Sequence, residues 1–258
     1  MFMNLFPRFG KGRILKKEML ECLRDYPKDF LDIYFKEYSN GIISGADVVV
    51  GENAVTVTRG IVKHNNRLYL LAKDYELFYN YTNREVLIKI KFLDETETGD
   101  FKCYSTIIFI DDNTEVGNDE LELGRFKLGE KARLRSKYTD FFDFITEFNT
   151  INIINVEYAG LKESTLNPSV LKSFSKVLLE SGSENINDFA FAMQSLNTRL
   201  VGKEAIICYL SKRLGVEFKE YSNMEIYKYL CQIVKEVKSG KKKNAEIKKD
   251  GPMRIIVD

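Results

Sequence analysis

The chain has a single histidine, His64, so few of its residues could act as a general base near neutral pH. His64 precedes the pair Asn65-Asn66, and asparagine tolerates the positive φ angles of tight turns between strands. We therefore expect a solvated histidine at the exposed end of a hairpin. One histidine also excludes zinc or iron sites that are built from several histidines.

An acidic segment, residues 111–122, contains the side chains that could bind a cation. If Asp111 is the first ligand, oxygen-bearing side chains fall at further ligand places: Asn113, Glu115, Asp119 and Glu122. The sixth place, which needs glycine, holds Val116, and the flanking sequences predict strands instead of helices. The pattern favours an acidic hairpin loop, with a loose calcium site as the alternative.

The glycines do not form a phosphate-binding motif. Gly10-Lys11-Gly12 lacks the spacing and the Lys-Ser/Thr ending of a P-loop. Gly41, Gly45 and Gly51 lack the GxGxxG spacing, and we expect them to form turns between strands.

The four cysteines, at positions 22, 103, 208 and 231, form no Cys-x-x-Cys unit. We expect buried free thiols in a reducing compartment. The sequence thus predicts no catalytic residue, no cofactor and no metal, and hence a protein that is not an enzyme. The remaining alternative is an enzyme whose pocket would be lined by Asp111, Asp112 and Glu115.

The overall charge argues against a general attraction to nucleic acid or to anionic membranes. The 258 residues include 39 Lys and Arg and 38 Asp and Glu, a net charge of +1. No stretch approaches the ~20 apolar residues that span a bilayer. Residues 1–13 are interrupted by Asn4, Pro7 and Arg8, unlike a signal peptide. We expect synthesis in the cytoplasm and no membrane insertion.

The elements that would position functional residues fall into blocks. Residues 14–37 have apolar side chains at near-helical spacing, with Pro27 expected to kink or split the helix. Its single apolar stripe predicts contact with the chain's own core or with a partner. The partner-binding candidates in this block are Ile14, Leu15, Met19 and Leu23.

Short alternating segments between residues 39 and 135 predict an antiparallel sheet or small sandwich. Residues 85–92 and 101–110 are expected to pair as a hairpin across the acidic linker 94–100. From residue 136 the spacing becomes helical, beginning with a stripe over 138–148, while residues 150–158 suit a strand or an extended connection.

Helix boundaries after residue 160 carry clear signals. Asn167-Pro168 predicts an N-cap followed by proline at the first helical position. Ser222 and Glu225 have the spacing of a capping box. Helices are expected at about 168–181, 187–200, 203–214 and 223–238, which together form a small bundle.

The last block, residues 239–258, has the composition of a basic tail with a terminal strand. Lys241, Lys242 and Lys243 could dock on an acidic surface, could contact phosphates or could simply be solvated. The tail lacks aromatic residues, so base stacking is not supported and nucleic acid is an unlikely partner. The strand-like Ile255, Ile256 and Val257 could pair with a neighbour's sheet edge or with their own domain.

The predicted fold class is α+β. It comprises an N-terminal helical arm (1–38), an antiparallel β domain (39–135), a C-terminal helical bundle (136–238) and the basic tail (239–258).

Residues 40–48 (NGIISGADV), 55–62 (VTVTRGIV) and 66–69 (NRLY) resemble a pattern in baseplate and tail structural proteins of contractile phage tails and phage-tail-like bacteriocins. The resemblance covers residues 40–71. It implies a multicopy protein of a baseplate or tail tip that contacts other subunits of a large assembly and carries no catalytic residue. The alternative is a cytoplasmic adaptor or regulator that binds a protein or nucleic acid through its basic tail.

Overall fold

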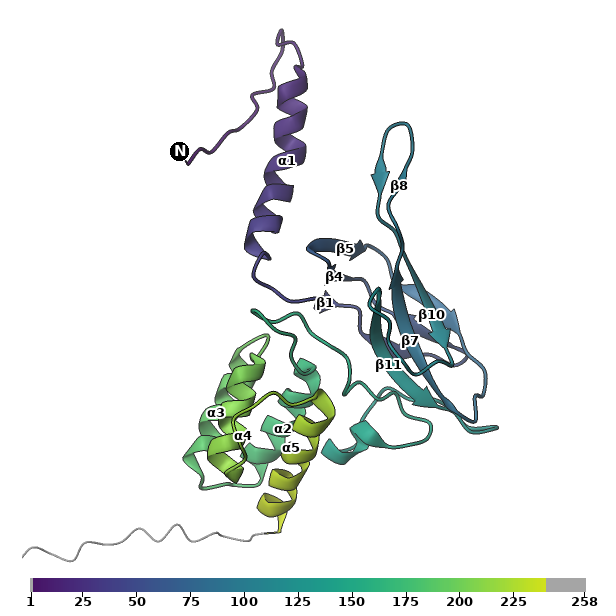
Figure 1. Cartoon of the computed structure of the whole chain (residues 1–258), viewed down its shortest axis with the longest axis vertical. Helices are drawn as coiled ribbons and strands as arrows, with labels where there is room; N and C mark the ends of the chain where they lie inside the picture. The colour runs from purple at the N-terminus through teal and green to yellow at the C-terminus, as the bar shows by residue number, and fades with distance from the viewer. Residues whose placement is uncertain (1, 240–258) are drawn as a thin grey trace, which may run out of the picture.

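The computed structural model describes residues 2–239, and the predicted Lys241–Lys243 and Ile255–Val257 sites lie outside that range. Figure 1 shows a projecting helix, a group of antiparallel sheets and a cluster of helices. Strands occupy the N-terminal half and helices the C-terminal half, which confirms the α+β class.

The β region consists of three-stranded antiparallel sheets and a short ribbon. The first sheet has the order β1-β4-β5, with bounds Gly41–Gly45, Gly60–His64 and Arg67–Leu71. The second, β2-β3-β6, comprises Val48–Val50, Ala54–Val57 and Tyr75–Phe78. The third, β10-β7-β11, comprises Thr106–Asp111, Glu85–Phe92 and Glu120–Lys127.

The predicted hairpin is confirmed, because β7 and β10 pair antiparallel and the acidic linker extends them as a ribbon. This ribbon consists of β8 (Thr96–Glu97) and β9 (Lys102–Cys103). The turn prediction is confirmed at Asn65 and Asn66, which have φ angles of 45° and 61°. It is wrong at Gly41 and Gly45, which begin and end strand β1. A Cβ on Gly45 would lie 2.1 Å from the Arg59 carbonyl oxygen, so this glycine permits the close pairing of β1 with β4.

The predicted helical stripe over 138–148 is wrong. Only a 3₁₀ helix forms there, Phe141–Ile145 (η1), with Asp140 accepting hydrogen bonds from the backbone of Phe142 and Asp143. The following residues then bond to the sheet: Asn152 pairs with Arg125 of β11, and Ile42 of β1 bonds to Glu157. An extended chain satisfies these sheet edges, and a continued helix would not.

The C-terminal half contains four α-helices among the described residues: α2 (Pro168–Glu180), α3 (Ile186–Asn197), α4 (Lys203–Leu214) and α5 (Asn223–Lys238). The boundary signals are confirmed. The Asn167 side chain accepts from the Ser169 N–H, and Ser222 and Glu225 form both bonds of the capping box.

Two hydrophobic cores stabilise the molecule. One lies among the strands and extends in sequence to Tyr158, and the other lies among the helices and begins at Phe141. Ile153 packs against both cores. The division into domains near residue 136 stays a prediction, and the segment 141–158 contributes side chains on both sides of it.

Candidate assembly surface on the N-terminal arm

The N-terminal arm (residues 2–38) contains helix α1 (Lys17–Tyr34), and none of that helix is buried. The helix projects from the rest of the molecule (Figure 1). Among the predicted partner-binding residues, Ile14 is 82% exposed, Leu15 and Leu23 are also exposed, and Met19 is half-buried. The structure therefore leaves the predicted apolar stripe uncovered by the described chain.

The exposed stripe has a regular spacing. Met19, Leu23, Tyr26, Phe30 and Ile33 are alternately four and three residues apart, which places them along one side of the helix. This is the spacing of seam positions in a coiled coil. Charged residues occupy the opposite side: Lys17, Glu21, Arg24, Asp25, Lys28 and Asp32. The stripe can thus accept another helix without burying a charge.

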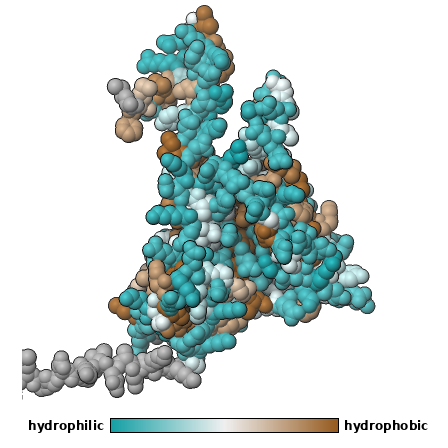
Figure 2. All heavy atoms as spheres, viewed as in Figure 1, coloured by the Kyte–Doolittle hydropathy of each residue, from teal (hydrophilic) through white to brown (hydrophobic). Residues whose placement is uncertain are grey.

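The segment before α1 adds aromatic surface beside the stripe. Phe2, Phe6 and Phe9 are exposed, and Figure 2 shows hydrophobic residues at the tip of the arm and along this segment. It folds back toward the helix, where the Cys22 thiol donates to the Leu5 carbonyl oxygen across 3.6 Å. The arm therefore presents a larger apolar surface than the helix alone.

Helix α1 has little local stabilisation. No side chain caps its first turn at Lys16, and Pro27 inside the helix has no N–H to donate to the preceding turn. In proteins, most of the stability of a helix comes from the packing of its apolar face, which α1 lacks in the described chain. The helix nevertheless continues through Pro27, so of the two expected effects the split is wrong and the kink stays a prediction.

A buried lysine fixes the root of the arm. Lys63 on β4 donates to the carbonyl oxygens of Phe35 (2.5 Å), Lys36 (3.3 Å) and Tyr38. Burial lowers the pKa of Lys63, and the Glu37 carboxylate opposes that shift. These carbonyls follow the negative end of the helix dipole, so the ammonium stabilises the helix terminus.

Backbone bonds join the same root to the segment after the sheets. Ser39 N–H donates to the Gly160 carbonyl (2.9 Å), and Lys162 N–H donates to Glu37 (2.8 Å). The arm is thus attached firmly at its base and free along its length. The sequence pattern did not identify Lys63, because it lies in an otherwise apolar strand and has no distinguishing motif.

The histidine prediction is wrong. His64 is 5% exposed, and its ring stacks on Phe92 with centroids 3.9 Å apart. Among residues 2–239, its Nε2 has no hydrogen-bond partner, and a carboxylate oxygen of Asp119 lies 3.7 Å away. The hairpin end packs against the neighbouring sheet, where an aromatic ring is buried more favourably than it is solvated. His64 is a packing residue.

The acidic loop faces an internal ammonium group. Lys89 is fully buried and donates to Asp111 (2.9 Å), to Glu120 (3.1 Å) and to the Glu115 carbonyl (2.5 Å). Burial opposes its charged form, but the two carboxylates outweigh this and raise the pKa of Lys89. The favoured hairpin loop is wrong, because β10 and β11 do not pair with each other and lie on opposite sides of β7. The acidic segment connects these two outer strands, and its carboxylates contact the Lys89 ammonium.

The cysteines and the possible metal ligands do not form a common site among the described residues. Cys231 is buried, but Cys103 and Cys208 are exposed and Cys22 is half-buried, so the prediction of buried thiols is wrong for most of them. Over residues 2–239, no three His, Cys, Asp or Glu side chains are grouped as metal ligands. In the same range, no helix has the length and apolarity needed to cross a bilayer.

Comparisons with known proteins do not assign the chain to a family. No family model matches the chain, and no curated protein matches it. The structure aligns with a solved structure described as the crystal structure of TssK. The alignment spans 88% of this chain and 68% of the TssK chain, with 8% sequence identity and a TM-score of 0.37. A similarity at this level supports no conclusion about function.

Proposed function

We propose that this chain is a structural component of a contractile phage tail or phage-tail-like particle, located in the baseplate or tail tip. It acts through protein–protein contacts, and its arm is the main contact surface. The observation that carries the proposal is an 18-residue amphipathic helix, none of whose residues is buried by the part of the chain that the structure describes. The sequence resemblance over residues 40–71 supplies the type of particle.

The arm is suited to bind a helix of another subunit. Its seam residues would be covered by a partner's apolar stripe, and the exposed Ile14 and Leu15 would extend the contact beyond the first turn. The firm root at Lys63 would transmit force from that contact to the sheets. An arm that reaches into a neighbour is one way in which symmetric assemblies connect subunits.

The residues that line the hollow between strands β5 and β10 are also consistent with a contact role. Its lining residues include no carboxylate, histidine or cysteine, and Asp111, Asp112 and Glu115 are absent from it. General acid–base catalysis most often uses a histidine or a carboxylate, and the residues of this hollow that could transfer a proton are Tyr69 and Tyr104. This hollow is therefore not the pocket of Asp111, Asp112 and Glu115 that the enzyme alternative predicted.

The test is incorporation into the particle. Replacing Leu23 and Phe30 with Gln removes the centre of the stripe while keeping good helix formers. A matched variant replaces Arg24 and Lys28, on the charged side, with Gln. Purified particles from cells that express each variant are compared by quantitative mass spectrometry.

We expect the stripe variant to be depleted from particles at least about tenfold and the charged-side variant to be incorporated normally. Normal incorporation of the stripe variant would show that the arm is not the contact. Absence of the unaltered chain from every particle fraction would overturn the proposed function itself.

A further inference from the structure

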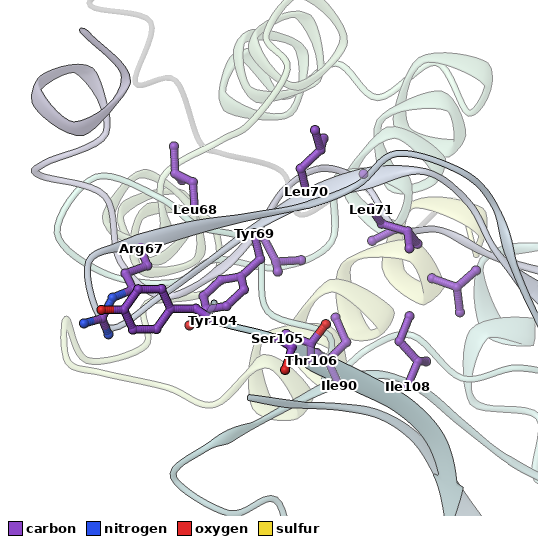
Figure 3. A pocket seen from close by; sticks show the side chains of 14 residues that line it. Arg67, Leu68, Tyr69, Leu70, Leu71, Ile90, Tyr104, Ser105, Thr106 and Ile108 are labelled. Atoms are coloured by element: carbon purple, nitrogen blue, oxygen red, sulfur yellow. The ribbon is translucent and has the colours of Figure 1, made fainter. Parts of the chain in front are cut away.

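Two outer strands line a common hollow in the β region. β5 is the outer strand of one sheet and β10 the outer strand of another, and within residues 2–239 no strand pairs with either outer edge. Residues from both strands line a hollow of about 380 Å³ (Figure 3). Each edge leaves alternate backbone N–H and C=O groups free for another strand.

The hollow has the character of a strand-binding groove. Figure 3 shows Tyr69 of β5 directed toward the side on which Ile90 and Ile108 lie. At one end, the Arg67 guanidinium lies over the Tyr104 ring at 4.0 Å from its centroid. The lining is apolar along its length and polar at this end, so it suits a short apolar strand with a charged residue at one end.

Strand β10 is poorly protected for an edge. None of its six residues is buried, Ile107 is 46% exposed, and Ile108, Phe109 and Ile110 are half-buried. Proteins usually protect such an edge with lysine, proline or a bulge, because an uncovered apolar edge recruits other strands. β10 has no such residue and ends in Asp111, so we expect the edge to be covered in the working assembly.

The chain carries a segment that fits this edge. Residues 253–257 (MRIIV) combine an arginine with β-branched residues, which favour strands. Residues 240–252 connect them to α5 and can extend over about 45 Å. Five lysines in this connection are complementary to Asp94, Glu95 and Asp119, which line a second hollow beside Tyr69 and Arg67.

The C-terminal end of α5 lies away from the groove. α5 ends at the bottom of Figure 1, whereas β5 and β10 lie near mid-height on the other side of the molecule. We propose that residues 253–257 of one copy pair as a strand with the outer edge of β10 in the hollow of a neighbouring copy. This inference rests on the proposed function only in requiring more than one copy of the chain.

The experiment uses the purified full-length chain without other particle proteins. A photo-cross-linking amino acid is placed at position 256, and this protein is mixed with an isotopically labelled unmodified chain before irradiation. Mass spectrometry then identifies both the labelled residues that react and the copy to which they belong. We expect cross-links from position 256 to β5 or β10 of the labelled copy.

Self-association provides a second measurement. Ile256→Asp places a charge within the proposed strand, and Asn244→Asp adds the same charge outside it; neither alters residues 2–239. Sedimentation equilibrium is expected to show at least about a tenfold weaker dimer for Ile256→Asp and little change for Asn244→Asp. Cross-links within one copy, cross-links outside the groove or equal weakening by both variants would overturn the inference. Failure of the arm variants in particles would leave these results unaffected.

Discussion

Helices α1 and α5 have similar patterns and opposite surroundings. Both carry apolar residues along one side and charges along the other. α5 buries seven of its 16 residues in the helical core, whereas α1 buries none of its 18. An amphipathic pattern therefore predicts that a face will be covered, and leaves open whether the same chain covers it.

The ends of the two helices differ in a way that the sequence does show. α5 begins with the reciprocal capping box of Ser222 and Glu225. α1 begins at Lys16 without a side-chain cap and contains Pro27. A helix with local caps and a packed face is stable on its own chain, whereas α1 depends on its root and, we propose, on a partner.

The largest expected difference between the helical core and the arm comes from replacing one phenylalanine with alanine in each. Phe174→Ala, at a fully buried position of α2, should lower the free energy of unfolding by about 3–5 kcal/mol. Phe30→Ala, at a position of α1 that is 60% exposed, should change it by less than about 0.5 kcal/mol. Urea unfolding followed by circular dichroism measures both. A large loss for Phe30→Ala would mean that the arm packs on its own chain.

A smaller effect concerns the segment that joins the two cores. Asp143 accepts from both guanidinium nitrogens of Arg135 (2.5 Å) and from Thr139 N–H (2.8 Å). Asp143→Asn should lower the free energy of unfolding by about 1–2 kcal/mol at pH 7, because the buried carboxylate loses its charge opposite the partly exposed Arg135. The matched Asp32→Asn in the arm should cost less than about 0.5 kcal/mol.

The same residue predicts a pH dependence. The Arg135 guanidinium holds the pKa of Asp143 below its usual range, while burial opposes the shift. A carboxyl whose pKa is lowered by folding stabilises the protein above its ordinary pKa of about 4, and this contribution is lost as the pH falls further. Unfolding curves between pH 2 and 5, roughly the range below and around that value, should therefore be less pH-dependent for Asp143→Asn than for the unaltered chain. Equal slopes would contradict the assignment.

The root of the arm is expected to respond to a similar extent. Lys63→Met keeps the apolar stem but removes the donor to Phe35 and Tyr38, at a cost of about 1–2 kcal/mol. Hydrogen exchange should accelerate near residues 35–39 and remain unchanged in α5. Unchanged exchange near the root would show that the backbone bonds of Ser39 and Lys162 suffice to fix it.

The smallest expected effect is at the helix ends. Ser222→Ala should lower the free energy of unfolding by about 1 kcal/mol, because it removes a cap from a packed helix. Lys16→Ser gives α1 a capping residue and should raise the helical signal without changing the unfolding midpoint. A shifted midpoint for Lys16→Ser would indicate that α1 unfolds together with the cores.

Local signals were sufficient for the boundaries of the C-terminal helices and for one tight turn. Asn167-Pro168, the Ser222–Glu225 capping box and Asn65-Asn66 each act through bonds or φ angles within a few residues. The helical pattern over 138–148 produced only the 3₁₀ helix Phe141–Ile145, and from Asn149 onward the chain bonds to sheet edges that are distant in sequence. The candidate arm was predictable as an apolar stripe, but its exposure was not.

The sequence alone determined the α+β class, the paired strands β7 and β10 and the capped helices, because each follows from periodicity or from bonds between near neighbours. The tertiary structure decided where the individual polar groups lie. Lys63, His64 and Lys89 all became buried because sheets that are separate in sequence packed around them. It also left α1 without a covering partner in the described chain, which depends on the spatial arrangement of elements and not on the sequence of any one of them.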